Sequence, residues 1–443
     1  AYEIVDCDWS SDVCSSDLSI PRDSPPAKWK KPFMNQQFKT QYPVTDRVRH
    51  AMQVSLRGCE ELIPQDEWQQ KLARSEATGV PLRIKLGLDP TAPDIHIGHT
   101  VVLNKMRQLQ DLGHQVIFLI GDFTSLIGDP SGRNSTRPPL TPEQIKANAE
   151  TYYRQASLVL DPERTEIRYN SEWSLPLGAM GMIQLAAKYT VARMMERNDF
   201  HQRYTAGTSI SVHEFLYPLM QGYDSVALKS DLELGGTDQK FNLLMGRHLQ
   251  LEYGQEPQCI LTMPLLEGLD GVDKMSKSKN NYIGITEEAN TMFAKVLSIS
   301  DALMWRWYTL LSFKSLEEIE ALKREVQAGR NPKEVKVLLA REITTRFHSA
   351  AAADAAEQDF ALRSRGGIPE DLAEQSLTGA PMGIGALLKA VGMAPSTSEA
   401  NRLVEGAGVR IDGVVVSDKG LKLDAGTFVL QVGKRKFVRV HLS

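Results

Sequence analysis

The sequence has few cysteines, no long apolar run and no excess of positive charge, and each absence excludes a class of protein. The 443 residues include only four cysteines, and their spacing is not that of a metal site; they are Cys7, Cys14, Cys59 and Cys259. Such sparse cysteine favours a reducing compartment. No run approaches the roughly 18 consecutive apolar residues of a membrane span. The net charge of −4 provides no global basic field, so nucleic-acid binding would need a local patch. We therefore expect a cytoplasmic, soluble protein with no membrane segment.

The composition is that of an ordinary globular protein of several domains. Hydrophobic residues make up 42% of the chain and charged residues 24%, as in typical soluble domains, and the length suits two to four domains. Residues 1 to about 31 differ, because they lack an amphipathic period and lack the basic start and apolar core of a secretory signal. This leader, taken to residue 33, resembles a translated cloning adapter and is expected to lie outside the fold. From residue 34 to Gly79 the pattern is helical, with suitably spaced apolar residues at Val48, Met52, Leu56 and Leu62.

One stretch, residues 81–137, organises the chain. Apolar and other residues alternate over 82–88, which predicts a strand. Apolar residues then recur at helical spacing from Val102 to Leu112, and the unbroken apolar run 116–120 is typical of a strand buried on both faces. The pattern predicts one βαβ unit.

Two histidines mark the start of the helix in this unit. His96 and His99 are three residues apart and so share one face of the first turn, while Gly98 lets another group approach the backbone. A helix N-terminus carries unpaired N–H groups and about half an elementary positive charge, and imidazoles beside it can donate hydrogen bonds to phosphate oxygens. A lone histidine here would more often be a cap or a surface residue, but the pair at a strand-to-helix turn indicates phosphate binding.

A loop punctuated by glycine and proline follows the second strand of the unit. It runs from Gly121 to Arg133 and includes Asp129, and Arg137 lies just beyond it. Open parallel sheets bind ligands at the carboxyl ends of their strands, so this loop is expected at a ligand site. Thr141 and the proline after it then predict the start of a helix.

A mainly helical insertion is expected over 143–230, interrupted by a short strand-like segment at 165–169. Within it, Tyr217, Gln221 and Asp224 are spaced i, i+4 and i+7, along one face of a helix. Buried polar groups without partners cost on the order of 1–3 kcal/mol each. The spacing alone leaves two interpretations open, a polar stripe facing solvent and a row of ligand-binding side chains.

Two further segments place polar residues after predicted strands. Residues 231–239 read as a strand, a glycine turn and a helix start that carries Asp238 and Gln239. A strand over 259–263 is followed by the basic loop, residues 274–279, with three lysines and two serines. A charge run is usually a solvated surface loop, but after the last core strand of a nucleotide-binding fold it can also reach pyrophosphate.

The C-terminal third divides into a helical part and a small module. The pattern is strongly helical over 286–363, and the glycine- and proline-containing stretch 364–381 reads as a linker. Residues 382–443 predict a helix pair followed by short strands. From Pro395 to Ser443, eight Lys or Arg residues oppose five Asp or Glu residues, a modest indication of RNA binding that a merely soluble module would also give.

Taken together, these motifs resemble a known family. His96-Ile-Gly-His99 and Lys274-Met-Ser-Lys-Ser278 resemble the two signature motifs of the class I aminoacyl-tRNA synthetases. Tyr217, Gln221 and Asp224, with 235–239, resemble the amino-acid pocket of the bacterial tyrosyl-tRNA synthetases. The tail from about residue 382 resembles their S-four-like (S4-like) RNA-binding domain, and the whole resemblance covers about 48–443.

The resemblance implies three domains. They are a Rossmann-like α/β parallel-sheet nucleotide-binding catalytic domain over 34–285 with a helical insertion, an α-helical domain over 286–363, and, after the linker, a small α+β S4-like domain over 382–443. It also implies a homodimer.

The resemblance further implies a two-step reaction. L-Tyrosine reacts with ATP to give tyrosyl-adenylate and pyrophosphate, and the tyrosine then passes to the 3′-terminal adenosine of tRNA(Tyr). ATP is a substrate that carries Mg²⁺ on its phosphates, and neither a permanent cofactor nor a metal held by the protein alone is expected.

The resemblance assigns roles residue by residue. The implied catalytic residues are His96, His99, Lys274 and Lys277. The implied ATP-binding residues are Asp89, Thr91, His96, Gly98, His99, Gly236, Asp238, Lys274, Lys277 and Ser278, with Gly236 and Asp238 at the ribose. The implied pyrophosphate-binding residues are Arg133 and Arg137. The implied tyrosine-binding residues are Asp224 for the phenol, Asp129, Tyr217 and Gln221 for the ammonium, and Gln239 for the carboxylate.

Lys85 is where the sequence departs from one large branch of this family. Four residues before the aspartate of Asp89-Pro-Thr, that branch has a tyrosine that binds the substrate phenol, and Lys85 stands there instead. The chain therefore resembles the other bacterial branch, and the second hydrogen-bond partner of the phenol stays open.

Three alternatives to this function remain at this point. They are a tryptophan-specific synthetase, a small-substrate nucleotidyltransferase of the same superfamily, and a non-catalytic RNA-binding protein. ATP–pyrophosphate exchange with tyrosine, with tryptophan and without an amino acid distinguishes them.

Overall fold

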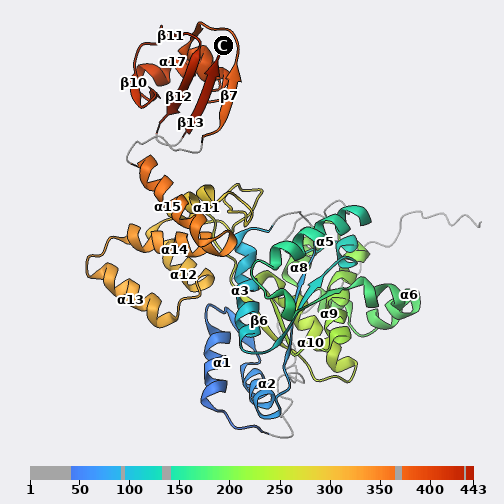
Figure 1. Ribbon diagram of the computed structural model, residues 1–443. Helices are drawn as coiled ribbons and strands as arrows, with labels where there is room; N and C mark the ends of the chain where they lie inside the picture. Colours follow the sequence, from blue (N-terminus) through green and yellow to red (C-terminus); the bar gives the residue numbers. More distant parts are fainter. Residues whose placement is uncertain (1–40, 91–94, 132–140, 365–371, 434–435) are drawn as a thin grey trace, which may run out of the picture. The chain divides into compact units, whose positions relative to one another are not determined.

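A computed structural model describes residues 41–443 except 91–94, 132–140, 365–371 and 434–435 (Figure 1). The leader predicted over 1–33 therefore lies outside the described residues. Within the described part of the chain, no helix is both long and apolar enough to cross a membrane.

A six-stranded sheet forms the centre of the first half of the chain. Its strand order is β1-β6-β5-β2-β3-β4. All neighbours in it are parallel except β1 and β6 at one edge. The connections reverse direction between β2 and β5, and doubly wound sheets bind ligands outside the carboxyl ends of the strands at such a reversal. This confirms the expected Rossmann-like α/β fold. The strands are β1 (Glu61–Ile63), β2 (Arg83–Leu88), β3 (Gln115–Ile120), β4 (Thr165–Tyr169), β5 (Leu232–Gly236) and β6 (Cys259–Met263).

The predicted βαβ unit is present as β2, α3 (Ile97–Asp111) and β3. The apolar run 116–120 is buried throughout, as a strand covered on both faces requires. Met106 and Leu109 of α3 are fully buried in the main core. The unit therefore holds the turn after β2 and the first turn of α3 at one end of the sheet.

Helices connect the strands and form the insertion between β4 and β5. They are α1 (Asp46–Leu56), α2 (Gln65–Thr78), α4 (Thr124–Ile127), α5 (Pro142–Ala156), α6 (Ser171–Ala186), α7 (Val191–Met194), α8 (Asn198–Thr205), α9 (Leu216–Leu228) and α10 (Lys240–Glu252). Single 3₁₀ turns are η1 (Pro162–Arg164), η2 (Val212–Phe215) and η3 (Thr237–Gln239).

Two expectations about this part need correction. The helical pattern predicted from residue 34 to Gly79 is, over its described part from residue 41, two helices with β1 between them, and Leu62 pairs with Leu261 in the sheet. A positive φ of 62° at Gly58 ends the first helix there. The segment 165–169 does not interrupt an insertion, because it is β4, the parallel neighbour of β3. Helix α5 is therefore the crossover between these two strands, and the insertion begins after β4.

A helical region follows the sheet, as the pattern from residue 286 predicts. Trp307 and Tyr308 are fully buried there, in the same apolar core as residues of α1 and α3. Asn104 of α3 donates from Nδ2 to the Leu311 carbonyl at 3.4 Å. The region comprises α11 (Ala289–Ser298), α12 (Asp301–Leu311), α13 (Leu316–Gln327), α14 (Pro332–Phe347) and α15 (Ala350–Ser364).

The C-terminal module has a core and a sheet of its own. Its five-stranded sheet has the order β10-β9-β12-β13-β7, and β8 pairs with β11. Part of the stretch predicted as a linker is strand β7, which pairs in parallel with β13, so the linker prediction fails for Glu374–Leu377. The elements are β7 (Glu374–Leu377), β8 (Met382–Gly383), α16 (Ile384–Ala390), α17 (Thr397–Glu405), β9 (Val409–Ile411), β10 (Val414–Val416), β11 (Lys422–Leu423), β12 (Gly426–Val432) and β13 (Lys436–Leu442).

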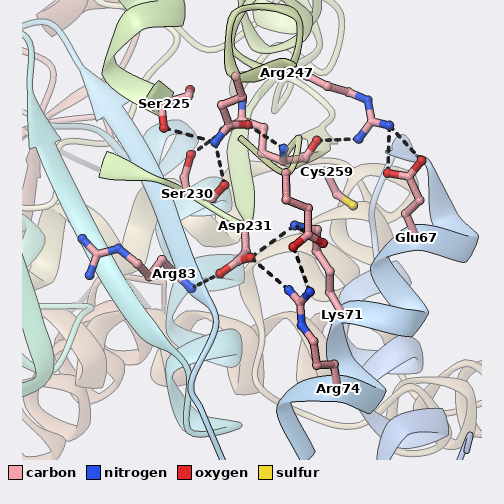
Figure 2. Close-up of polar contacts among 12 residues, drawn as sticks. Glu67, Lys71, Arg74, Arg83, Ser225, Ser230, Asp231, Arg247 and Cys259 are labelled. Atoms are coloured by element: carbon pink, nitrogen blue, oxygen red, sulfur yellow. Dashed lines mark hydrogen bonds and ion pairs between the residues drawn. The ribbon is translucent and has the colours of Figure 1, made fainter. Parts of the chain in front are cut away.

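A network of charged side chains fixes helices to the amino ends of the strands (Figure 2). Asp231, just before β5, accepts from the Arg83 N–H at 2.9 Å and from Lys71 Nζ of α2 at 3.2 Å. Arg247 of α10 pairs with Glu67 of α2 at 2.8 Å. These contacts anchor helices at the amino ends of the strands, and the sequence predicts functional residues at the opposite, carboxyl ends.

Candidate active site

The site begins at the carboxyl end of β2, where Asp89 lies. Its Oδ1 accepts from Thr124 Oγ1 at 2.7 Å, and its Oδ2 accepts from the Tyr217 hydroxyl at 2.8 Å. A Cβ on residue 121 would lie 2.0 Å from Asp89 Oδ1, so only glycine leaves room for this carboxylate. Burial, and then the charge of Asp89, raises the pKa of Tyr217 well above its usual value. The Tyr217 hydroxyl therefore stays protonated and donates.

His96 and His99 lie in the first turn of α3, as predicted. His96 is the N-cap residue, and its Nδ1 accepts from the Gly98 N–H at 3.2 Å; Nδ1 of His99 accepts from the His96 N–H at 3.3 Å. A Cβ on Gly98 would lie 2.9 Å from the His96 ring, so the group that approaches this glycine is the imidazole itself. Two N–H groups at the helix start are thus already bonded, which leaves the imidazoles as donors toward a phosphate.

Both imidazoles are neutral near pH 7. Burial, and then His99 and Lys277, lowers the pKa of His96 to about 2. Burial lowers the pKa of His99 to about 4, and Lys277 and Lys274 contribute. A neutral imidazole whose Nδ1 accepts a hydrogen bond carries its proton on Nε2. Each ring therefore offers one Nε2–H donor.

The basic loop is held from inside by Asn281. Its Oδ1 accepts from the Ser276 N–H at 2.8 Å, and its Nδ2 donates to Asp270 Oδ2 at 2.6 Å. A Cβ on Gly268 would lie 2.3 Å from the Asn281 side chain, so this glycine makes room for the amide. Asn281 is buried, and the loop it braces has a defined conformation.

The segment after the loop is hydrogen-bonded to the start of α3. The Ile97 N–H donates to the Ile283 carbonyl at 2.9 Å, and the Ile285 N–H donates to the Ile95 carbonyl at 3.2 Å. The two signature motifs, far apart in sequence, are therefore neighbours.

The charges of the loop lysines act on groups at the start of α3 and after β5. Lys274 and Lys277 both lower the pKa of His99. Burial raises the pKa of Asp238, and the charge of Lys274 opposes this rise. A Cβ on Gly236 would lie 2.6 Å from Asp238 Oδ1, so glycine is needed there too. The loop lysines are therefore within electrostatic reach of the start of α3 and of Asp238 after β5.

Asp129 and Gln239 meet across this edge of the sheet. Gln239 Nε2 donates to Asp129 Oδ2 at 2.8 Å, and the Ser131 N–H donates to Oδ1 at 2.8 Å. Asn242 Nδ2 donates to Gln239 Oε1 at 2.9 Å. The loops after β3 and β5 therefore share one polar cluster.

Asp224 is a buried carboxylate with polar neighbours. It is 2% exposed, and it accepts from Trp173 Nε1 at 2.8 Å and from Asn170 Nδ2 at 3.4 Å. Burial raises the pKa of Asp224 to about 7, against the charge of Lys85 and the hydrogen bonds from Trp173 and Asn170. A carboxylate has about four acceptor positions, so this one retains capacity for a ligand donor.

Gln221 carries an acceptor with no partner among the described residues. Its buried Oε1 is unbonded, and its Nε2 lies 3.5 Å from Glu233 Oε1. Buried polar atoms almost always have a partner, so this oxygen is suited to a donor on a ligand. Tyr217 and Asp224 on the same face of α9 are buried, which excludes a solvent-facing stripe.

A cavity of about 890 Å³ lies beside Asp238. Its lining includes Thr237 and Lys240 after β5 and Arg197 and Asn198 at the start of α8. Small-molecule sites typically measure about 300–1,000 Å³, so this volume suits a small ligand, and Asp238 is the one proposed site residue among the described residues that line it.

Most of the residues proposed from the sequence lie along this edge of the sheet, but not all can be placed. Thr91, Arg133 and Arg137 lie outside the described residues. Ser278 is exposed, and its hydroxyl lies 3.3 Å from that of Ser276. Sequence reasoning missed several polar partners of the site: Thr124, Asn170, Trp173, Glu233 and Asn281. Asn170 directly follows β4, so the rule that ligands bind at carboxyl ends of strands was a signal that could have found it.

The chain is similar to known synthetases over most of its length. Residues 77–363 match the family model of tRNA synthetases class I (W and Y), and 383–429 match the S4 domain. The tyrosine–tRNA ligase of Cupriavidus pinatubonensis is 74% identical over 402 residues, which are 91% of this chain and 97% of that protein. That of Ralstonia nicotianae is 75% identical over 392 residues, 88% of this chain and 100% of that protein.

Solved structures share the fold. The C-terminally truncated mitochondrial tyrosyl-tRNA synthetase of Coccidioides posadasii is 21% identical, with a TM-score of 0.59 over 71% of this chain and 91% of that one. The tyrosyl-tRNA synthetase of Archaeoglobus fulgidus, solved with L-tyrosine, is 22% identical, with a TM-score of 0.57 over 69% of this chain and 99% of that one. The two family models and the high identity over nearly whole proteins settle the assignment, and the chain belongs to the tyrosine–tRNA ligases among the class I tRNA synthetases.

Proposed function

We propose that this ligase uses the crevice at the carboxyl edge of its sheet to join L-tyrosine to ATP, and then transfers the tyrosine to the 3′-terminal adenosine of tRNA(Tyr). The observation that carries the proposal is the identity of about three-quarters to tyrosine–tRNA ligases over nearly their whole length. It favours tyrosine over the tryptophan and nucleotidyltransferase alternatives, and the motif lysines and histidines argue against a non-catalytic protein.

The proposed amino-acid pocket is formed by the face of α9 that carries Tyr217, Gln221 and Asp224. Asp224 accepts the phenol hydroxyl, because it is buried and retains acceptor capacity beside Trp173 and Asn170. The ammonium donates to the unbonded Oε1 of Gln221, to the Tyr217 oxygen and to Asp129. Gln239 uses one amide hydrogen on Asp129, and its second is left for the carboxylate.

The histidines and the basic loop form the proposed phosphate side. The tyrosine carboxylate is already ionised, so attack on the α-phosphate needs no enzyme base, and catalysis rests on positioning and on neutralising the charge that develops on the phosphates. The Nε2–H donors of His96 and His99 and the charges of Lys274 and Lys277 supply this stabilisation. Gly98 keeps the helix start close to the ring of His96, and Gly236 and Asp238 are proposed at the ribose.

The remaining assignments continue this proposal. Asp89 and Thr91 belong to the ATP site, Ser278 to its phosphate end, and Arg133 and Arg137 to the leaving pyrophosphate. Mg²⁺ arrives with ATP, held mainly by phosphate oxygens. The reaction is cytoplasmic, where tRNA is charged.

A homodimer is proposed as well. Large apolar side chains are exposed on the insertion, notably Leu175, Met180 and Ile183 of α6 and Val191 of α7. Several exposed apolar side chains of this size on one insertion support a protein–protein contact, and a second copy of this chain is the proposed partner.

ATP–pyrophosphate exchange tests the function directly. The purified chain should exchange label into ATP with tyrosine, and not with tryptophan or without an amino acid. Exchange with tryptophan alone would contradict the proposal, and no exchange at all would support the non-catalytic alternative.

Truncation after Ser364 is expected to spare tyrosyl-adenylate formation and to weaken charging of tRNA(Tyr). This end point removes β7 together with β13, its partner in the sheet, whereas a cut at residue 382 would leave β7 without that partner. The loss of basic residues should also reduce the salt dependence of tRNA binding. Pyrophosphate exchange and aminoacylation measured side by side check this, and an equal loss of both would mean that the module serves the fold.

Removal of residues 1–31 is expected to leave both activities unchanged, because the segment lacks the patterns of a folded element. Exchange and aminoacylation rates of the shortened and full chains provide the comparison. A clear loss in the shortened chain would assign the leader a role.

A further inference from the structure

Lys85 is a fully buried lysine in the middle of the central sheet. It is 0% exposed, and its strand β2 lies between β3 and β5. Lysine is almost never fully buried unless it is paired. Its Nζ lies 2.9 Å from Glu233 Oε1 and donates to Ser225 Oγ at 2.8 Å. Glu233 is its direct neighbour in the strand register and is 1% exposed.

The ion pair is connected to the wall of the tyrosine pocket. Ser225 follows Asp224 on α9, and its hydroxyl also donates to Glu233 Oε2 at 3.0 Å. Gln221, one turn earlier on the same helix, lies 3.5 Å from the other oxygen of Glu233. Two of the proposed tyrosine-binding residues are therefore connected to the ion pair. Gln221 contacts Glu233 directly, and Asp224 is connected through the adjacent residue Ser225.

Residues of α10 and of the segment just before β6 also pack closely against this network. Gln258 Nε2 donates to Glu233 Oε2 at 2.5 Å. A Cβ on Gly246 of α10 would lie 2.4 Å from Ser225 Oγ and 2.6 Å from Gln258 Nε2. The backbone of Gly246 therefore packs directly against the side chains that hold Glu233, and a larger residue at this position would displace them.

We propose that Lys85 is a positioning residue for tyrosine selectivity: through its contacts with Ser225 and Glu233 it fixes the turn of α9 that carries Gln221 and Asp224. The inference rests on the proposed function and deepens it, because it assigns the pocket a second determinant that does not touch the substrate. A buried ion pair by itself contributes little net stability. The proposed role of this pair is therefore to hold α9 through the contacts with Ser225 and Gln221.

The charges around Asp224 set the sign of the expected pH effect. Lys85 of β2 faces it with a positive charge, Glu233 of β5 with a negative one, and Tyr217 on its own helix is coupled to it. Lys85 lowers the pKa of Asp224 more than Glu233 raises it. Loss of the Lys85 charge therefore raises the pKa of Asp224. As the pH is lowered, activity that needs the ionised carboxylate is then lost at a higher pH than in the wild type.

The test is Lys85→Met in the full-length enzyme, because methionine fills a similar volume without the charge. Pyrophosphate exchange is measured with tyrosine and with phenylalanine between pH 6 and 9. We expect a raised KM for tyrosine, an unchanged KM for ATP and a reduced preference for tyrosine over phenylalanine. The acid limb of kcat/KM for tyrosine should move up by about one pH unit or more, as expected when a nearby opposite charge is lost.

A second variant separates this role from simple neutralisation of Glu233. Lys85→Met combined with Glu233→Gln leaves no unpaired buried charge, so it also guards against a failure of the single variant to fold. The double variant should keep the reduced selectivity and an upward, smaller shift of the acid limb. The proposal would be overturned if the double variant kept the wild-type preference for tyrosine over phenylalanine and an unchanged acid limb of kcat/KM for tyrosine.

Lys71→Met is the matched control. Lys71 is as buried as Lys85, with 1% of its side chain exposed, and it pairs with Asp231 at the opposite edge of the sheet (Figure 2). Its loss should lower stability without changing the tyrosine-to-phenylalanine ratio. If the wild type failed to exchange with tyrosine, the proposed function itself would fail. If the wild type preferred tyrosine to phenylalanine, and Lys85→Met showed the same preference and the same acid limb of kcat/KM, the proposed function would stand and only this inference would fail.

Discussion

Lys277→Ala is expected to reduce tyrosine-dependent ATP–pyrophosphate exchange by about 10²–10³-fold, the usual loss on removing one preorganised donor of charge stabilisation. The Lys277 ammonium is proposed to act where charge accumulates as pyrophosphate leaves, and its charge lowers the pKa of both His96 and His99. The loss should fall on kcat more than on the KM for tyrosine, because the lysine is proposed to act on the phosphates.

Lys279→Ala is the control for this substitution. Lys279 belongs to the same loop, but its Nζ pairs with Asp273 at 2.6 Å and its side chain is half exposed. Exchange by this variant should stay near the wild-type rate. An unchanged rate in Lys277→Ala would remove the basic loop from the mechanism, and equal losses in both variants would indicate a disturbed loop.

Asp224→Asn is expected to lower kcat/KM for tyrosine by about 10–100-fold, the range for a lost hydrogen bond to a charged group. The amide would replace one acceptor oxygen by a donor, in a pocket where Trp173 and Asn170 already donate. The phenol hydroxyl would then lose its acceptor or face another donor.

Phenylalanine provides the internal control for this variant. It has no hydroxyl, so its activation should change little, and the ratio of the two kcat/KM values isolates the contact with the phenol. Equal losses for both amino acids would show that Asp224 supports the helix instead. Exchange rates with each amino acid at saturating ATP give both values.

The positions that sequence could predict are those where a local pattern and a topological rule agree. The helix start at His96 follows from the turn between an alternating segment and an apolar run, and Asp238 follows from the glycines that end β5. Each lies at the carboxyl end of a strand, where a parallel sheet places its ligands.

The rest depends on partners that no local pattern identifies. Lys85 alternates with apolar residues in β2, which suggests a solvent-exposed face, but Ser225 of α9 lies against it and the lysine is fully buried. Trp173 reaches Asp224 from 51 residues away in the chain, and Asn281 braces its loop by a side chain that looks like any polar loop residue. Only the packed structure reveals these pairs.

The hydrogen bonds between Ile97 and Ile283 and between Ile95 and Ile285 also bear on the order in which the protein is made. Chains generally fold from the N-terminus as they leave the ribosome. Here the histidine helix reaches its final surroundings only after about 190 more residues have been added, and α12, which packs in the same core as α3, comes later still. A nascent chain that already contains the first motif, and even β4 and β5, therefore lacks these hydrogen bonds beside the proposed phosphate site. We expect activity to appear only late in the synthesis of the chain.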